Sequence, residues 1–238
     1  MKHFIILLLL GAGLWACSDV YTITAVSDTV EVNDSVNSNK YVDSLIAPYR
    51  KSLSEEMDVV IGYSKHDMTK GRPNASLNNW AVDAMVDYEK LLKGSAIENY
   101  PPIIGLLNVG GLRNPISQGD ITTGDIFKLM PFDNEVVWVE MPWESLVDIQ
   151  DYLITKGGEP ISGATLIQDS LILDQVSEPT ESFWVITSDY LMNGGDHMDF
   201  FDKQLQHQYG SGLLRDAFIE SVRIQDTLNY NTTERIQL

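Results

Sequence analysis

The chain has 238 residues, of which 44% are hydrophobic, and its 16 basic and 34 acidic residues give a formal net charge of −18. This length and apolar content suit one large domain, or one domain with an arm, around a sizeable core. The negative charge argues against a nucleic-acid backbone as partner, because binding a phosphodiester chain demands a basic surface. It does not exclude a small anionic ligand, since local donors rather than net charge decide such a site.

The first segment is predicted to be a lipoprotein signal peptide, residues 1–16. Lys2 and His3 precede an uncharged apolar run of thirteen residues, FIILLLLGAGLWA, which is short for a membrane span and typical of a signal peptide. The string LWAC at 14–17 resembles a lipobox and ends in the only cysteine, Cys17, which is the expected lipidation site. An ordinary signal peptide with a chance cysteine is the alternative.

Lipidation at Cys17 would make this a lipid-anchored protein of the bacterial cell envelope, on the periplasmic or surface face. The acylated chain would then have no cysteine left for a disulfide or a nucleophile. Residues 17–39 mix Ser, Thr, Asp, Asn and Val without a helical period, so we expect a tether there. Residues 40–238 are expected to form the domain. Its first helix, marked by apolar residues between 42 and 49, should bend or stop at Pro48.

Helices and strands interleave along the rest of the chain. Strands are predicted at 58–64, 101–109, 134–141 and 182–196, and helices at 75–94, 122–130, 142–158 and 211–225. Asn74 or Ser76 is expected to cap the helix at 75–94, and Gly94 to end it. Thr122, three residues before Asp125, indicates a capping box at the helix that follows. Because the elements lack a strict βαβ rhythm, the prediction is a layered α/β domain with a mixed sheet.

Two predicted strands end in glycine loops, NVGGLR at 108–113 and MNGGDH at 192–197. Glycine lets the backbone approach a ligand closely and turn through positive φ. Asn108 and Arg113 are candidate binding groups in the first loop, since a guanidinium presents a rigid fork of donors to phosphate or carboxylate. Asn193 and Asp196 are the candidates in the second, where a carboxylate can accept paired hydroxyl donors. Two tight turns with merely structural polar groups are the alternative.

Three strings resemble, in order and spacing, the C-terminal domain of the 5'-nucleotidases: SLNNWAVDAM at 76–85, NVGGLRNPISQGDITTGDIFKLMPFDNEVV at 108–137, and YLMNGGDHMDFF at 190–201. The resemblance covers about residues 40–225 and implies that family's fold and its recognition of a nucleoside or nucleotide. By position, the implied binding residues are Asn108, Arg113, Phe132, Tyr190 and Asp196, together with Arg72, which lies near but not at the aligned spacing.

Phe132 and Tyr190 are expected to enclose the base, because stacking on aromatic rings is worth roughly 1–3 kcal/mol per base. The alternative for each ring is a place in the core. Arg113 is expected to meet the ribose–phosphate side of the ligand. Val109 and His197 stand where the family usually has glycine, and their bulk is expected to narrow the cleft.

The family also carries an N-terminal metallophosphatase domain, and this chain shows no sign of its ligand clusters. After the predicted signal peptide the histidines are His66, His197 and His207, and the pairs KHD and GGDH are expected to be polar loops. We therefore expect no metal or other cofactor in this chain, and two divalent metals in a partner metallophosphatase subunit.

The leading hypothesis is the nucleotide-recognition half of a split 5'-nucleotidase, inactive alone. A non-catalytic nucleoside- or nucleotide-binding lipoprotein for uptake, or a scaffold that has lost the ligand, are the alternatives.

Overall fold

The computed structural model describes residues 39–238 except 101, 175, 177–179 and 230. The predicted signal peptide, Cys17 and the tether up to residue 38 lie outside the described residues. The chain divides into two parts after Ile46, within helix α2 (Lys40–Met57). None of the residues of α2 is buried, and Pro48 lies inside the helix without interrupting it. No helix in the described part of the chain is long and apolar enough to cross a membrane.

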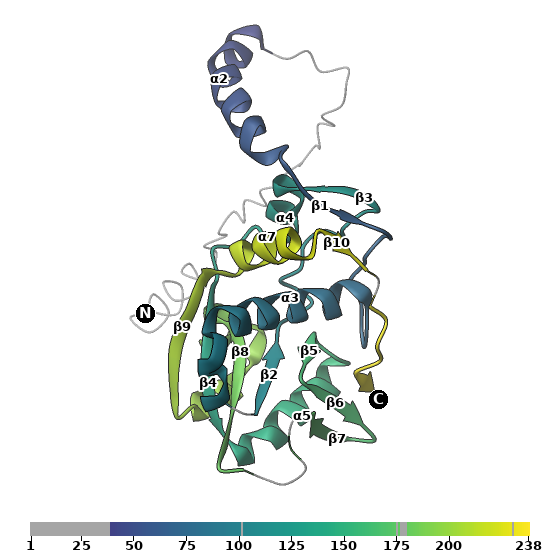
Figure 1. The fold of residues 1–238 in the computed structure, drawn as a ribbon, viewed down its shortest axis with the longest axis vertical. Helices are drawn as coiled ribbons and strands as arrows, with labels where there is room; N and C mark the ends of the chain where they lie inside the picture. The colour runs from purple at the N-terminus through teal and green to yellow at the C-terminus, as the bar shows by residue number, and fades with distance from the viewer. Residues whose placement is uncertain (1–38, 101, 175, 177–179, 230) are drawn as a thin grey trace, which may run out of the picture. The chain divides into compact units, whose positions relative to one another are not determined.

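A five-stranded mixed sheet organises the second part (Figure 1), and its strand order is β5-β2-β8-β4-β9. The strands are β2 (Ile103–Leu106), β4 (Glu135–Pro142), β5 (Ile161–Ser162), β8 (Ser182–Ser188) and β9 (Gln206–Leu213). Strands β2 and β8 are parallel, with Ile103 opposite Trp184. Strand β4 is antiparallel to β8, with Val136 opposite Ser188. The ends of β2 and β8 and the start of β4 therefore lie at the same edge of the sheet.

Both faces of this sheet are buried, because side chains alternate between two core clusters. Trp138 packs into the cluster that contains helices α3 (Ser76–Lys93) and α7 (Leu214–Gln225), and α3 crosses this face in Figure 1. Its neighbour Val139 packs into the opposite cluster, which contains α5 (Leu146–Lys156). This layered arrangement of helices on a mixed sheet confirms the predicted α/β class.

The helix ends test the predicted caps. Gly94 ends α3 as predicted, with its N–H bonded to the carbonyls of Leu91 and Lys90. The N-cap of α3 is Ala75, which has no capping side chain, so the prediction that Asn74 or Ser76 caps this helix is wrong. The Asn74 side chain is instead used at long range, since its Oδ1 accepts from the N–H of Ile236 at 3.0 Å.

Helix α4 (Thr123–Leu129) carries the predicted capping box. The N–H of Asp125 donates to Thr122 Oγ1 at 3.2 Å, and the N–H of Thr122 donates to Asp125 Oδ2 at 3.0 Å. These two bonds fix the start of α4, which precedes the MPFD segment at 130–133.

Two small sheets complete the described fold, with strand orders β10-β1-β3 and β11-β6-β7. Their strands are β1 (Val60–Ser64), β3 (Gly119–Thr122), β6 (Ala164–Ile167), β7 (Ser170–Leu173), β10 (Thr227–Leu228) and β11 (Ile236–Gln237). Only β1 among them was predicted from the sequence. One further short helix, α6 (Asp189–Met192), and four 3-10 turns, at 94–99, 143–145, 195–197 and 199–203, connect these elements.

Candidate functional site

Three loops meet at one edge of the five-stranded sheet. One loop follows β2, the second follows β8 and includes α6, and the third precedes β4. They leave the sheet together because β2 and β8 are parallel neighbours and β4 runs antiparallel to β8. The loops enclose a cavity of about 270 Å³. Its walls are formed by Asn108, Gly110, Gly111, Arg113, Phe132, Tyr190 and Asp196.

The structure thus brings together five of the six site residues named from the sequence, and Arg72 is not among the residues that line the cavity. The five come from positions up to 88 residues apart. Their meeting depends on the strand order, which no local sequence pattern displays.

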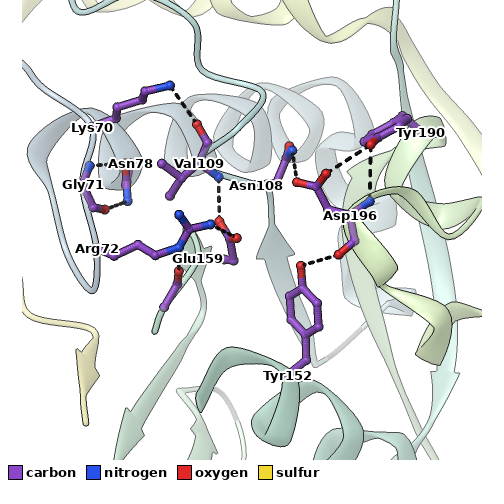
Figure 2. A network of polar contacts seen from close by, with 11 residues as sticks. Lys70, Gly71, Arg72, Asn78, Asn108, Val109, Tyr152, Glu159, Tyr190 and Asp196 are labelled. Carbon is purple, nitrogen blue, oxygen red and sulfur yellow. Dashed lines mark hydrogen bonds and ion pairs between the residues drawn. The ribbon is translucent and has the colours of Figure 1, made fainter. Parts of the chain in front are cut away.

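Asp196 occupies the centre of a set of hydrogen bonds (Figure 2). Its Oδ2 accepts from Asn108 Nδ2 at 2.6 Å and its Oδ1 accepts from the Tyr190 hydroxyl at 3.1 Å. Its backbone carbonyl accepts from the Tyr152 hydroxyl at 3.2 Å. The backbone of Asp196 has φ 53°, a left-handed conformation that few residues with a Cβ adopt. The surrounding bonds therefore hold a carboxylate at the cavity in an uncommon backbone conformation.

Burial of Tyr152, followed in importance by the negative charges of Glu159 and Asp196, raises the pKa of its phenol well above the ordinary value. Tyr152 therefore stays protonated at neutral pH and remains a donor. Its ring packs edge-on against Phe200 with 5.5 Å between centroids. This contact and the burial of the ring fix the direction from which the hydroxyl reaches Asp196.

The glycines of both loops make room for the site's own side chains. A Cβ on Gly195 would lie 2.5 Å from Cε1 and 2.5 Å from the carbonyl oxygen of Tyr190. A Cβ on Gly111 would lie 2.7 Å from Asn108 Oδ1. Real Cβ atoms do not approach so closely, so Gly195 is required beside the backbone of Tyr190, and a larger residue at position 111 would displace the Asn108 side chain.

The two aromatic residues of the cavity lie outside the core. Phe132 is 41% exposed and Tyr190 is 45% exposed, so the core alternative is wrong for both rings. Tyr190 belongs to α6, whose start is capped by the Ser188 hydroxyl accepting from the N–H of Leu191 at 3.3 Å. The strand predicted at 182–196 therefore ends at Ser188, and the helical turn directs Tyr190 to the cavity wall.

Arg113 contributes an exposed guanidinium to the cavity. Its N–H donates to the carbonyl of Leu129 at 2.7 Å, which fixes its backbone beside the end of α4. Its Nη1 donates to the carbonyl of Gly110 at 3.2 Å. Arg113 makes no ion pair with any residue that the structure describes, so most of its donor fork faces solvent at the cavity.

Arg72 supports the first loop from outside the cavity (Figure 2). Its Nε donates to the carbonyl of Gly158 at 2.8 Å, and its Nη2 pairs with the buried carboxylate of Glu159. Glu159 Oε2 in turn accepts from the N–H of Val109 at 2.6 Å. Lys70 adds a bond from its Nζ to the carbonyl of Val109 at 3.4 Å. The structure therefore places Arg72 behind the loop backbone and not on the cavity wall.

The two departures from the family pattern do not narrow the cavity, contrary to expectation. Val109 is 7% exposed and does not line it. His197 is exposed and does not line it either. The backbone of His197 has φ 65°, in the region that favours glycine, so the histidine carries a conformational cost of the left-handed backbone.

Three residues that the sequence reasoning missed hold the site in place: Tyr152, Glu159 and Arg215. They lie 44, 50 and 83 positions from the residues they bond, namely Asp196, Val109 and Phe132. Only Arg215 left a signal in the sequence, since its charge falls within the apolar face of a predicted helix.

Within the described residues, no group of three or more His, Cys, Asp or Glu side chains is arranged to hold a metal ion. A larger cavity, of about 380 Å³, lies between α3 and α7. Asp83 on its wall accepts from Arg235 Nη2 at 2.6 Å and from Ser162 Oγ at 2.7 Å. Gln225 on the same wall donates to Ser221 Oγ at 2.8 Å. Asp83 and Gln225 on the wall of this larger cavity therefore already have hydrogen-bond partners.

Residues 60–149, which include the first glycine loop and Phe132, match the sequence model of the family described as 5'-nucleotidase, C-terminal domain. This stretch is similar to a 5'-nucleotidase C-terminal domain. The apyrase of Tabanus yao is 22% identical over 198 residues, which are 71% of this chain and 35% of the apyrase. Protein UshA of Escherichia coli (strain K12) is 21% identical over 209 residues, which are 82% of this chain and 35% of UshA.

The fold agrees with this family. A crystal structure of a 5'-nucleotidase precursor from Thermus thermophilus matches with a TM-score of 0.65 at 16% identity, over 83% of this chain and 43% of that one. The chain spans about a third of the length of the curated relatives named above.

Proposed function

We propose that the domain recognises a nucleoside or nucleotide in the cavity at the sheet edge, as the recognition half of a split 5'-nucleotidase. One observation carries the proposal: two exposed aromatic rings, an oriented carboxylate and an arginine without an ion pair among the described residues line one cavity. Ligand pockets usually measure about 300–1,000 Å³. The volume of about 270 Å³ therefore suits a base with its sugar better than a dinucleotide.

Each side chain has a role that follows from its chemistry. Phe132 and Tyr190 offer ring faces for stacking on the base. Asp196 has about four lone-pair sites, of which Asn108 and Tyr190 use two, so two are left for the hydroxyls of a ribose. The fork of Arg113 fits a phosphate oxygen pair.

Hydrolysis of the phosphate ester is proposed to need a separate metallophosphatase subunit with two divalent metals. Uncatalysed phosphate-ester hydrolysis is among the slowest reactions, and a two-metal site supplies the activated water and the charge stabilisation. Binding of the nucleoside end supplies orientation but no nucleophile. The proposal is supported by the match of residues 60–149 to the C-terminal domain of a family that carries its metal ligands in an N-terminal domain.

Titration of the purified domain with a panel of nucleosides and nucleotides, by calorimetry, tests the recognition. We expect saturable binding and no phosphate release with added Mn²⁺ or Zn²⁺. Absence of binding would favour a scaffold that has lost the ligand. Turnover that survives removal of trace phosphatases would overturn the split-enzyme proposal. An unchanged KM of a matching metallophosphatase in the presence of this domain would favour the uptake lipoprotein.

The envelope location is proposed from the lipobox-like LWAC string. Acylation requires the sulfur of Cys17, and two or more acyl chains give stable membrane anchoring. Metabolic labelling with a clickable fatty acid should therefore mark the wild type and not Cys17→Ser, and the variant should leave the membrane fraction. A wild type without label would contradict the lipid anchor.

A further inference from the structure

Arg215 in the first turn of α7 contacts the loop that carries Phe132. We propose that Arg215 is a positioning residue for the cavity, because it fixes the backbone of residues 130–133 and through it the place of the Phe132 ring. The effect on ligand affinity rests on the proposed function, whereas the effect on the loop does not.

The guanidinium of Arg215 bonds several residues of this loop at once. Its Nη1 donates to the carbonyls of Phe132 at 3.3 Å and Met130 at 3.5 Å. Its Nη2 donates to Asp133 Oδ1 at 2.8 Å. The centre of the guanidinium lies 4.2 Å from the ring centroid of Phe127 on α4. The N–H donors at the edge of the planar guanidinium therefore bond the loop, while its flat face stacks on the Phe127 ring of α4.

Burying the charged Arg215 side chain costs more free energy than burying an apolar side chain at this position would. The Arg215 side chain is only 9% exposed, and burying a charge costs free energy unless it is paired and hydrogen-bonded. Asp133 is 80% exposed, so the ion pair contributes little. Arg215 Nε is buried without a partner among the described residues. An apolar side chain would pack on this face of α7 without leaving a buried polar atom unpaired. The bonds to the loop backbone are therefore what an arginine adds at this position.

The ring of Phe132 needs such support because the core does not supply it. Phe132 is 41% exposed, so packing against the core holds its ring only in part. The loop is fixed at its far end by Asp189 Oδ1, which accepts from the N–H of Glu135 at 3.0 Å and from the N–H of Tyr190 at 2.8 Å. Between these ends, the carbonyl of Asn134 accepts from the N–H of Leu214 at 2.8 Å, and the Arg215 side chain is bonded to the carbonyl of Phe132 itself.

A double-mutant cycle with adenosine as the probe tests the proposal. Arg215→Met should weaken adenosine binding by about tenfold, and Arg215→Lys, which keeps the charge but lacks the fork, by less. In the Phe132→Ala background, Arg215→Met should cause no further loss, because Arg215 acts through that ring. Asp133→Asn is the matched control. It weakens the exposed ion pair, leaves the carbonyl bonds, and should bind adenosine as the wild type does.

Equal losses from Arg215→Met in both backgrounds would overturn the proposal. The proposal would also be overturned if Arg215→Met lowered the melting temperature but left adenosine binding unchanged. If Arg215→Met does not fold, the same double-mutant cycle is performed with Arg215→Lys in its place.

The effect of Arg215 on the backbone mobility of the loop can also be measured without a ligand. Backbone NMR order parameters of the Phe132 and Asp133 amides should drop in Arg215→Lys and stay unchanged in Asp133→Asn. If the wild type binds no adenosine but the order parameters drop, the proposed function fails and the positioning role stands. Unchanged order parameters would contradict the positioning role whatever the binding result.

Discussion

The side-chain amide of Asn108 donates to the carboxylate of Asp196 over 2.6 Å and joins the two glycine loops across 88 residues of sequence. The bond fixes which oxygen of Asp196 faces the loop after β2 and which lone pairs remain for a ligand. It also packs the amide directly over Gly110 and Gly111, where a Cβ would lie within 3.3 Å and 2.7 Å of the Asn108 amide atoms.

Asn108→Ala should weaken nucleoside binding by about ten- to hundredfold, because a hydrogen bond to a charged group contributes roughly 1.5–3 kcal/mol. Calorimetric titration measures the loss. Asn193→Ala is the matched control, since that side chain belongs to the second loop and donates to the carbonyl of Asp189 at 2.7 Å without lining the cavity. Equal losses from both variants would show that the loops respond to any missing amide.

Gly195→Ala should lower the melting temperature and abolish nucleoside binding together. The added Cβ would meet the backbone carbonyl and the ring of Tyr190 at 2.5 Å, and the backbone oxygen cannot move aside cheaply. Gly71→Ala provides the comparison, because its Cβ would lie 3.7 Å from the Cβ of Ala75, which is an ordinary contact. Thermal melting and nucleoside titration are measured for both variants. If Gly195→Ala matches Gly71→Ala in melting temperature and affinity, the close contact with Tyr190 is not what makes glycine necessary.

Phe132→Ala should separate binding from stability. Because the ring is 41% exposed, its removal should cost less than about 1 kcal/mol of unfolding free energy. Loss of stacking should weaken nucleoside binding by roughly 1–3 kcal/mol. Phe183→Ala, which truncates a fully buried ring, should instead cost about 3–5 kcal/mol of stability. Denaturant unfolding and titration give both quantities, and a large loss of stability in Phe132→Ala would assign that ring a structural role.

Tyr152→Phe should change how stability depends on alkaline pH. Burial raises the pKa of Tyr152 above that of an unfolded tyrosine, so the unfolded phenol ionises first. The stability that Tyr152 contributes is therefore complete below about pH 10 and falls as pH rises beyond it, by at most about 1.4 kcal/mol per unit. The gap in unfolding free energy between wild type and Tyr152→Phe should shrink from pH 8 to pH 11. A constant gap would contradict the role of the phenol.

The long elements could be predicted because their signals are local. Helix α3, strand β4 and helix α7 show apolar spacing within their own residues, and the structure confirms all three. Strand β9 (Gln206–Leu213) could not be found in this way, because its sequence QHQYGSGL contains two glycines and little apolar alternation. It forms through distant partners, among them buried Glu89, whose Oε1 accepts from the N–H of Ser211 at 2.8 Å.

The site could be predicted only in part. The family resemblance supplied Asn108, Tyr190 and the other residues that share the cavity, since whole motifs carry position as well as residue type. Arg72 lay off the aligned spacing, and the structure pairs it with Glu159. The charge of Arg215 within the apolar face of a predicted helix marks that residue as unusual, but its partners are backbone carbonyls 83 and 85 positions away, which residue identity does not reveal.

The bonds between α3 and the segment before β11 set an order of events during protein synthesis. Arg235 donates to both oxygens of Asp83, at 2.9 Å and 2.6 Å, across 152 residues. At about 5–20 residues per second, a ribosome needs roughly 8 to 30 seconds to make the chain between these two partners. Through that interval the Asp83 carboxylate lacks its native partner, so this contact between α3 and the segment before β11 cannot form. This ion pair is therefore completed only after nearly all of the described chain has been made.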